Sequence, residues 1–172
     1  NGERDEYVLV IPAYNESATI REVVQGALGH FGTVIVVDDG STDGTVEKLS
    51  NLPVTLRLHP ENLGKAASLW NGMQTALSLG AKGVVTMDGD GQHDPADLPG
   101  LLMAAQTHPD RLVIGSRLWN RDVIPKARYR ANRFANFWIA WASGQAIEDS
   151  QSGFRVYPAQ LIRVCRFEPS RD

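Results

Sequence analysis

Two carboxylates, Asp88 and Asp90, are the residues of this chain whose types and spacing are best suited to chemistry. They follow an apolar run at residues 83–87, which is typical of a buried strand, and a single glycine separates them. Two carboxylates held this close repel each other unless a cation neutralises them or one of them keeps a proton. Carboxylate oxygens are the ligands that hard divalent cations prefer. The pair is therefore a candidate metal site at the end of a strand.

Three kinds of site could use this pair. A calcium-binding EF-hand loop beginning at Asp88 needs a glycine and a glutamate where the chain has His93 and Pro99, so this alternative is excluded. A phosphatase of the haloacid-dehalogenase type would use Asp88 as its nucleophile and Asp90 as an acid and base. A site for a nucleotide diphosphate would use both carboxylates to hold the cation that neutralises the leaving group. The last two alternatives stay open on this motif alone.

The elements that must position the pair alternate along the chain. Apolar runs typical of strands cover residues 7–11, 34–37, 54–58, 83–87 and, as a fifth candidate, 112–114. Helical patterns lie between them at residues 20–28, 45–49 and 64–79. We expect Asn15 to cap the first helix. Its predicted buried residues are Ile20, Val23, Val24, Ala27 and Leu28, and those of the third helix are Ala67, Trp70, Met73 and Leu77. Strands alternating with helices predict an α/β fold with a mostly parallel sheet flanked by helices.

Polar residues follow four of these strands, and in parallel sheets ligands bind beyond the carboxyl ends of the strands. The groups are residues 12–16, 38–41, 62–65 and 88–90. Any one of them could simply start a helix or form a turn. Four successive strand ends of this kind predict a binding site instead. Of the four histidines, we expect only His93 to lie on this rim, as a hydrogen-bonding partner of the acidic loop.

The composition and charge of the chain exclude several classes of protein. With 172 residues, of which 42% are hydrophobic and 22% charged, the chain has the composition of a single soluble domain. Its net charge of -3 gives no reason to expect nucleic-acid binding. A single cysteine excludes an internal disulfide and a multi-cysteine zinc site. The sequence has no recognisable signal peptide or membrane span, so we expect a cytoplasmic location, peripheral to a membrane if the substrate is a lipid.

Six motifs together resemble those of family 2 glycosyltransferases, and most closely the polyprenyl-phosphate branch of the dolichyl-phosphate mannose synthase type. The resemblance spans residues 8–157. The motifs, in chain order, are IPAYNE at 11–16, VVDDGSTDGT at 36–45, NLGKA at 62–66, MDGDGQHDP at 87–95, GSR at 115–117 and DSQSGFR at 149–155. Each motif alone is weak evidence, but six in this order are specific.

The resemblance implies a GT-A fold whose residues 7–95 bind a nucleotide sugar and whose residues 96–172 receive the acceptor. Asp88, Asp90 and Gln92 match the residues that bind Mg2+ or Mn2+ in the family. Asp90 is therefore also expected to be catalytic. The residues expected around the base, ribose and diphosphate are Pro12, Ala13, Tyr14, Glu16, Asp39, Lys65 and Asp88.

On the acceptor side, Asp149 matches a position that acts as a base or orients the acceptor in this inverting family. A lipid phosphate is already ionised near neutral pH, so Asp149 would then orient the acceptor without removing a proton. Arg117 and Arg155 are candidates for binding its phosphate by forked hydrogen bonds. Residues 130–143 combine basic and aromatic side chains, which suits either a core helix or a helix at a membrane surface.

The expected function is thus inverting, metal-dependent transfer of a sugar from a GDP- or UDP-sugar to a polyprenyl phosphate. A non-catalytic module that binds nucleotide sugars is a further alternative. Members of this branch continue past the motif at residues 149–155, so we expect the C-terminus to be truncated.

Overall fold

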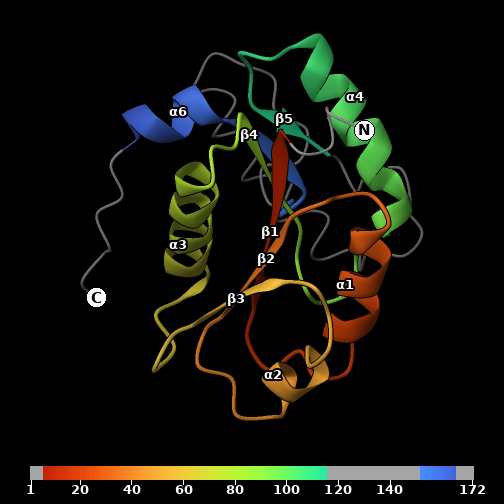
Figure 1. The fold of residues 1–172 in the computed structure, drawn as a ribbon, viewed down its shortest axis with the longest axis vertical. Coiled ribbons are helices and arrows are strands. Elements are labelled where there is room, and N and C mark those ends of the chain that lie inside the picture. The colour runs from red at the N-terminus through yellow and green to blue at the C-terminus, as the bar shows by residue number, and fades with distance from the viewer. Residues whose placement is uncertain (1–5, 116–151, 166–172) are drawn as a thin grey trace, which may run out of the picture.

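The computed structural model describes residues 6–115 and 152–165. These residues include a six-stranded sheet with the strand order β3-β2-β1-β4-β6-β5 (Figure 1). β1 to β4 pair in parallel, and β6 pairs antiparallel with both of its neighbours. The predicted α/β fold with a mostly parallel sheet is confirmed. The strands are β1 (Tyr7–Ala13), β2 (Val34–Asp38), β3 (Thr55–Leu58), β4 (Gly83–Thr86), β5 (Val113–Ile114) and β6 (Arg155–Pro158).

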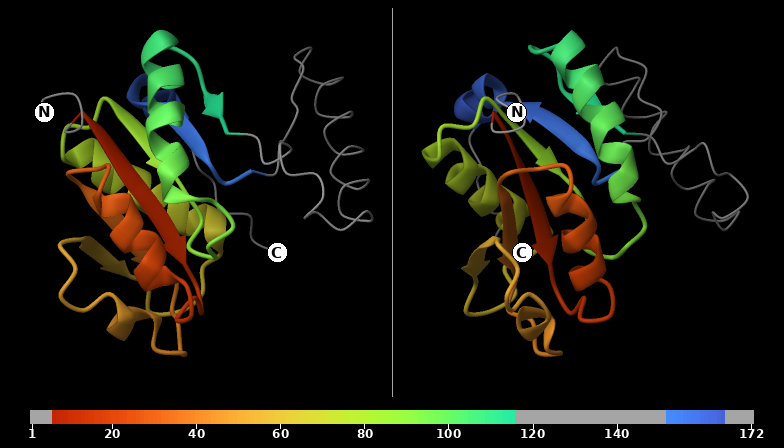
Figure 2. Two further views of the ribbon diagram at one scale, coloured as in Figure 1. Left: turned by 90° about the vertical axis from the view of Figure 1, so that its right-hand side faces the viewer. Right: turned by 45° about the vertical axis from the view of Figure 1, so that its right-hand side comes forward.

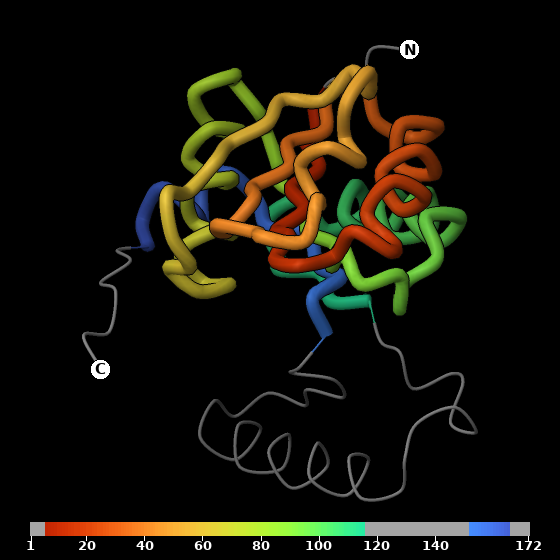
Figure 3. The backbone as a smooth tube through the Cα atoms, turned by 90° about the horizontal axis from the view of Figure 1, so that it is seen from below, coloured from red at the N-terminus to blue at the C-terminus, as the bar shows by residue number. Residues whose placement is uncertain are grey.

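Helices cover both faces of this sheet (Figures 1 and 3). α1 and α4 pack on one face, whereas α3 and α6 pack on the other. In Figure 2, α4 lies beside β5 and β6. The helices are α1 (Ile20–Leu28), α2 (Thr45–Lys48), α3 (Lys65–Ser78), the 3-10 helix η1 (Pro95–Asp97), α4 (Leu98–Thr107) and α6 (Ala159–Val164). No helix among the described residues is long and apolar enough to cross a bilayer.

The central strand β1 is buried on both faces because its side chains alternate between two apolar layers. Leu9 and Ile11 belong to the cluster that packs with α1 and α4. Val8 and Val10 belong to the cluster that packs with α3 and α6. This strand therefore fixes the position of its own carboxyl end, where the polar residues of the predicted site begin.

The buried face of α3 differs from the prediction. Among the four residues predicted to be buried, only Met73 is buried, while Ala67 is partly buried and Trp70 and Leu77 pack at the edge of the same cluster. The centre of the contact is Gly72, where a Cβ would overlap the side chain of Val10. The helix can lie this close to the sheet because the residues on its buried face are small. Such a face lacks the spaced large apolar residues from which the prediction was made. The buried residues of α3 are Ser68, Gly72, Met73 and Ala76.

The prediction that Asn15 caps α1 is wrong. The helix begins at Ile20 with Thr19 at the N-cap position. Asn15 has a φ of 55°, and its side-chain oxygen accepts a hydrogen bond from the backbone N–H of Thr42 at 2.9 Å. Its side chain therefore joins the loop after β1 to the loop after β2. The predicted buried face of α1 is confirmed except at Leu28, which is only partly buried.

The strand order reverses at β1, since β2 pairs with one of its edges and β4 with the other. In open α/β sheets, ligands bind in the crevice outside the carboxyl ends of the strands at such a reversal. The loops after β1 and β4 flank this point, and they carry Tyr14 and Glu16 on one side and Asp88 and Asp90 on the other. The topology therefore predicts that a ligand binds between these two loops.

Gly40, in the loop after β2, allows a test of how tightly the neighbouring loop is packed. Its φ is +75°, and a Cβ would lie 2.7 Å from the backbone carbonyl carbon of Glu61. We expect Gly40→Ala to lower the free energy of unfolding by about 2 kcal/mol or more, measured by urea denaturation. Gly80→Ala is the matched control, because Gly80 has a φ of +86° but nothing within 4 Å of its Cβ position. Equal losses in both variants would show that the packing against Glu61 contributes nothing.

Candidate functional site

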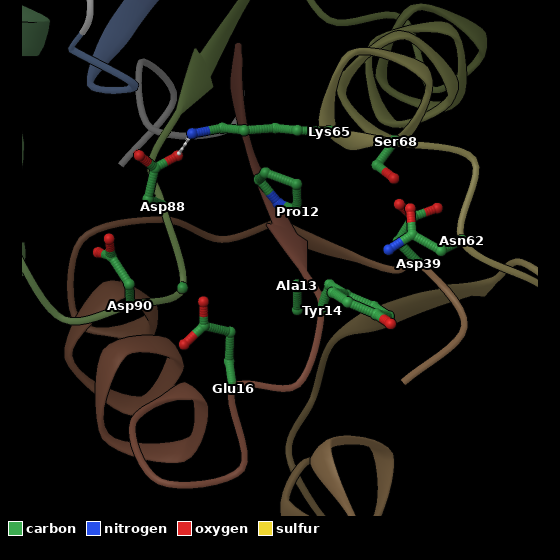
Figure 4. A pocket seen from close by; sticks show the side chains of 11 residues that line it. Pro12, Ala13, Tyr14, Glu16, Asp39, Asn62, Lys65, Ser68, Asp88 and Asp90 are labelled. Atoms are coloured by element: carbon green, nitrogen blue, oxygen red, sulfur yellow. Dashed lines mark ion pairs between the residues drawn. The ribbon is translucent and has the colours of Figure 1, made fainter. Parts of the chain in front are cut away.

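A pocket of about 290 Å3 lies at the carboxyl ends of β1, β2 and β4 (Figure 4). It brings together predicted site residues from four separate segments of the chain. Asn62, Ser68 and Gly89 line it as well, and Ser68 was not expected from the sequence. The predicted site residues that line the pocket are Pro12, Ala13, Tyr14, Glu16, Asp39, Lys65, Asp88 and Asp90.

The pocket has two chemically different ends, separated by Pro12 of β1 (Figure 4). Glu16, Asp88 and Asp90 form the acidic end. The other end is formed by Tyr14, Asp39, Asn62 and Ser68. Tyr14 is 46% exposed, and its ring offers a flat apolar surface. A ligand with a flat ring at one end and a group that carries a bound cation at the other would suit this division.

Asp39 is held by a dense set of hydrogen bonds. Its Oδ1 accepts from the backbone N–H of Leu63 at 3.0 Å and lies 2.7 Å from Nδ1 of His59. Its Oδ2 accepts from the backbone N–H of Gly64 at 2.8 Å. Nδ2 of Asn71 lies 2.8 Å from Nε2 of His59 and can only donate, so Nδ1 of His59 carries the proton shared with Asp39. The carboxylate thereby fixes the loop between β3 and α3.

The expectation that only His93 lies on the rim is wrong, because His59 contacts a pocket residue directly. His59 is the first residue after β3, so the rule that identified the other strand ends also points to it. His93 is buried and stacks on Phe154, with ring centroids 4.9 Å apart and an interplanar angle of 19°. Its ring therefore packs against the segment that carries β6.

The hydrogen bonds of Asp39 affect how the stability of the fold depends on pH in acid. Burial alone would raise the pKa of Asp39, but the hydrogen bonds from His59, Leu63 and Gly64 together lower it below its usual 3.8. A carboxyl whose folded-state pKa is lowered stabilises the fold above the unfolded-state value, and this contribution is lost as the pH falls through the lowered pKa. We therefore expect Asp39→Asn to lose less stability than the wild type between pH 4 and pH 2. The free energy of unfolding of both proteins would be measured by urea denaturation at several pH values in this range. An equal loss in the variant and the wild type would contradict the prediction.

Among the described residues, Lys65 and Asp88 form an ion pair at the acidic end. Nζ of Lys65, at the beginning of α3, lies 2.6 Å from Oδ1 of Asp88 (Figure 4). The lysine side chain is 55% exposed, whereas that of Asp88 is 14% exposed. Solvent therefore screens the lysine, and this pair alone neutralises the acidic end only in part.

Burial and the neighbouring carboxylates affect the pKa of Glu16. Its pKa is raised, first by burial and then by repulsion from Asp90, and a hydrogen bond from Thr19 opposes this shift. Thr19 also donates to the backbone carbonyl of Gly89 at 2.7 Å, which ties the loop after β1 to the loop after β4. Part of this rise comes from Asp90, so the carboxylates of Glu16 and Asp90 lie close enough to repel each other.

A divalent cation fits this charge balance. Among the described residues that line the pocket, four are carboxylates, Glu16, Asp39, Asp88 and Asp90, and one carries an ammonium group, Lys65. A diphosphate would be repelled here unless a cation entered with it. Across residues 6–115 and 152–165, no three acidic, histidine or cysteine side chains are grouped as a ready-made metal site. Asp88 and Asp90 would therefore need further oxygen ligands, which a diphosphate can supply.

The remaining predicted site residues lie elsewhere. Gln92 is exposed, and its backbone N–H donates to Oδ1 of Asp90 at 3.0 Å. Arg155 donates through Nε to the carbonyl of Ser152 at 2.6 Å, so its guanidinium supports its own chain segment. Neither residue lines the pocket as the structure describes it. Arg117, Asp149 and residues 130–143 fall outside the described residues.

Comparisons with known proteins agree with this geometry. The model of the family described as glycosyl transferase family 2 matches residues 8–165. UDP-N-acetylglucosamine–dolichyl-phosphate N-acetylglucosaminyltransferase from Methanococcus voltae is 30% identical over 177 residues, which cover 91% of this chain and 70% of that protein. Polyprenol monophosphomannose synthase from Mycolicibacterium smegmatis is 32% identical over 174 residues, which cover 90% of this chain and 62% of that protein.

A solved structure shares the fold. Glucosyl-3-phosphoglycerate synthase from Mycobacterium tuberculosis, crystallised with Mn2+, uridine diphosphate and phosphoglyceric acid, superposes with a TM-score of 0.72 at 22% identity. The match covers 91% of this chain but only 57% of that structure. The fold is therefore GT-A, as the resemblance implied. Since the family model covers the strands, the pocket and β6 together, this chain belongs to glycosyltransferase family 2.

Proposed function

We propose that this chain transfers a sugar from a nucleotide diphosphate sugar to a polyprenyl phosphate, with inversion at the anomeric carbon and with the help of Mg2+ or Mn2+. The observation that carries the proposal is the divided pocket, with the ring of Tyr14 at one end and an acidic cluster paired with Lys65 at the other. Two relatives support the choice of acceptor, because the name of one includes dolichyl-phosphate and the name of the other includes polyprenol monophosphomannose.

The donor is proposed to bind along the whole pocket. Its base and ribose occupy the end formed by Tyr14 and Asp39, where the exposed tyrosine ring can stack on a base. Its diphosphate occupies the end formed by Asp88 and Asp90. A divalent cation bound by these two carboxylates supplies the positive charge that stabilises the diphosphate as it leaves.

The reaction itself needs few groups on the protein. An oxygen of the acceptor phosphate attacks the anomeric carbon from the side opposite the diphosphate. The new carbon–oxygen bond forms as the bond to the diphosphate oxygen breaks, and the electron pair of the broken bond stays on the leaving diphosphate. The acceptor is already ionised, so no proton has to be removed. Lys65, beside Asp88, adds a second cation near the leaving group.

The acceptor side of the proposal rests on residues outside those that the structure describes. Asp149 is proposed to orient the acceptor, and Arg117 to bind its phosphate. Residues 130–143 are proposed to contact the membrane surface, on the cytoplasmic side, where the lipid would be reached. Arg155 is assigned a supporting role here, since its guanidinium holds the carbonyl of Ser152.

Calorimetric titration with GDP and UDP, each with and without Mn2+ or Mg2+, tests the donor site. We expect one of the two nucleotides to bind, and to bind more tightly with the metal. A transfer assay with the corresponding nucleotide sugar and a polyprenyl phosphate then tests the reaction. Binding without transfer would favour a non-catalytic module. A phosphoryl group trapped on Asp88 would favour the phosphatase alternative, for which the family match gives no support.

A further inference from the structure

A short turn from the C-terminal part of the chain packs directly against the first carboxylate of the predicted metal pair. This turn, residues 152–154, precedes β6, and Gly153 is at its centre. A Cβ built on Gly153 would overlap Oδ1, Oδ2 and Cγ of Asp88. The carboxylate of Asp88 thus occupies the space that a side chain at position 153 would need.

The turn is held firmly, so it cannot move aside easily. Oγ1 of Thr86 donates to the carbonyl of Gly153 at 2.7 Å, which ties the turn to β4. Nε of Arg155 donates to the carbonyl of Ser152 at 2.6 Å. Ser152 is fully buried, and Phe154 is 5% exposed. The hydrogen bond to β4 and the burial of its neighbours therefore hold the turn in place beside Asp88.

A second contact joins the same two segments. The ring of His93, three residues after Asp90, stacks on the ring of Phe154 with 4.9 Å between their centroids. The acidic loop is thereby attached to the turn at its far end, while Asp88 meets the turn at its near end. Both ends of the loop are positioned by residues that follow it by some 60 positions in the sequence.

We propose that Gly153 is a positioning residue for the metal site: its missing side chain leaves the space in which the carboxylate of Asp88 is held in its binding orientation. The need is for space, because Gly153 is not among the described glycines with a positive φ. This inference rests on the proposed function, in which Asp88 and Asp90 hold the cation. Substituting a residue that orients a metal ligand commonly lowers the metal affinity by about 10- to 100-fold. We expect an effect in this range at Gly153.

Gly153→Ala tests the proposal because it adds one methyl group at this point. We expect Mn2+ to bind at least about tenfold more weakly to the variant in the presence of GDP or UDP, measured by calorimetry. Nucleotide binding without metal should stay unchanged, because Tyr14 and Asp39 lie at the other end of the pocket. General damage to the fold would weaken both. Gly100→Ala is the matched control, since Gly100 is an exposed residue of α4 with nothing within 4 Å of its Cβ position.

The outcomes separate this inference from the proposed function. Wild-type Mn2+ affinity in Gly153→Ala would overturn the inference and leave the proposed function intact. A wild-type protein that binds nucleotide without any effect of Mn2+ would overturn the metal site itself, and the inference with it. If Gly153→Ala does not fold, Thr86→Val decides, because it removes the hydrogen bond to the carbonyl of Gly153 without adding atoms near Asp88. A selective loss of Mn2+ affinity supports the inference, and wild-type affinity in that variant overturns it.

Discussion

Replacing Asp90 with alanine is expected to reduce metal-dependent sugar transfer by about a thousandfold. The variant would keep Asp88 but lose the second of the two carboxylates proposed to hold the cation, so the leaving diphosphate would lose its main source of positive charge. A transfer assay with saturating nucleotide sugar and varied Mn2+ measures the effect. Activity like that of the wild type would contradict the proposed metal site.

The fold should survive this substitution. After burial, repulsion from Asp90 is the largest cause that raises the pKa of Glu16. Removing Asp90 relieves this repulsion, so the metal-free variant should melt at the same temperature as the wild type or higher, as is common when a charge is removed from a functional site. Asp110→Ala is the matched control, because Asp110 is an exposed aspartate in the turn between α4 and β5. It should leave both transfer and melting temperature unchanged.

The strand ends of the pocket could be predicted because two simple signals coincide there. The apolar runs of β1, β2 and β4 are nearly uninterrupted, as expected for strands buried on both faces. Polar residues follow each run directly, and parallel strands bring their carboxyl ends to the same edge. Asp39 and Asp88 therefore meet at one pocket although they are far apart in the sequence.

Other elements could not be predicted, for identifiable physical reasons. α4 contains Pro99 and Gly100, which argue against a helix, but Pro99 lies in the first turn, where the missing N–H costs nothing. β6 has only four residues, including an arginine and a proline, and it forms because β4 offers it a free edge. The close packing of Gly153 against Asp88 depends on this pairing. Such contacts arise from the tertiary arrangement and leave no periodic signal in the sequence.

Replacing Lys65 with methionine should change two affinities in opposite directions. In the metal-free protein, Lys65 is the counter-ion of Asp88 at 2.6 Å, so it competes with a metal ion for this carboxylate. Without it, Mn2+ alone should bind several-fold more tightly; the gain stays small because the lysine is more than half exposed and its charge is screened. The nucleotide diphosphate, however, should bind about 10- to 100-fold more weakly, because a charge-assisted hydrogen bond to the phosphates is lost.

Calorimetry with Mn2+ alone, and then with GDP or UDP in the presence of Mn2+, separates the two effects. Lys82→Met is the matched control, since Lys82 is also an exposed lysine in an ion pair, with Glu6, but it precedes β4 at the opposite end of the sheet. It should change neither affinity. If both affinities fell together in Lys65→Met, Lys65 would be a structural support of the loop. Opposite shifts would instead mean that one ammonium group serves Asp88 in the resting protein and the diphosphate in the complex.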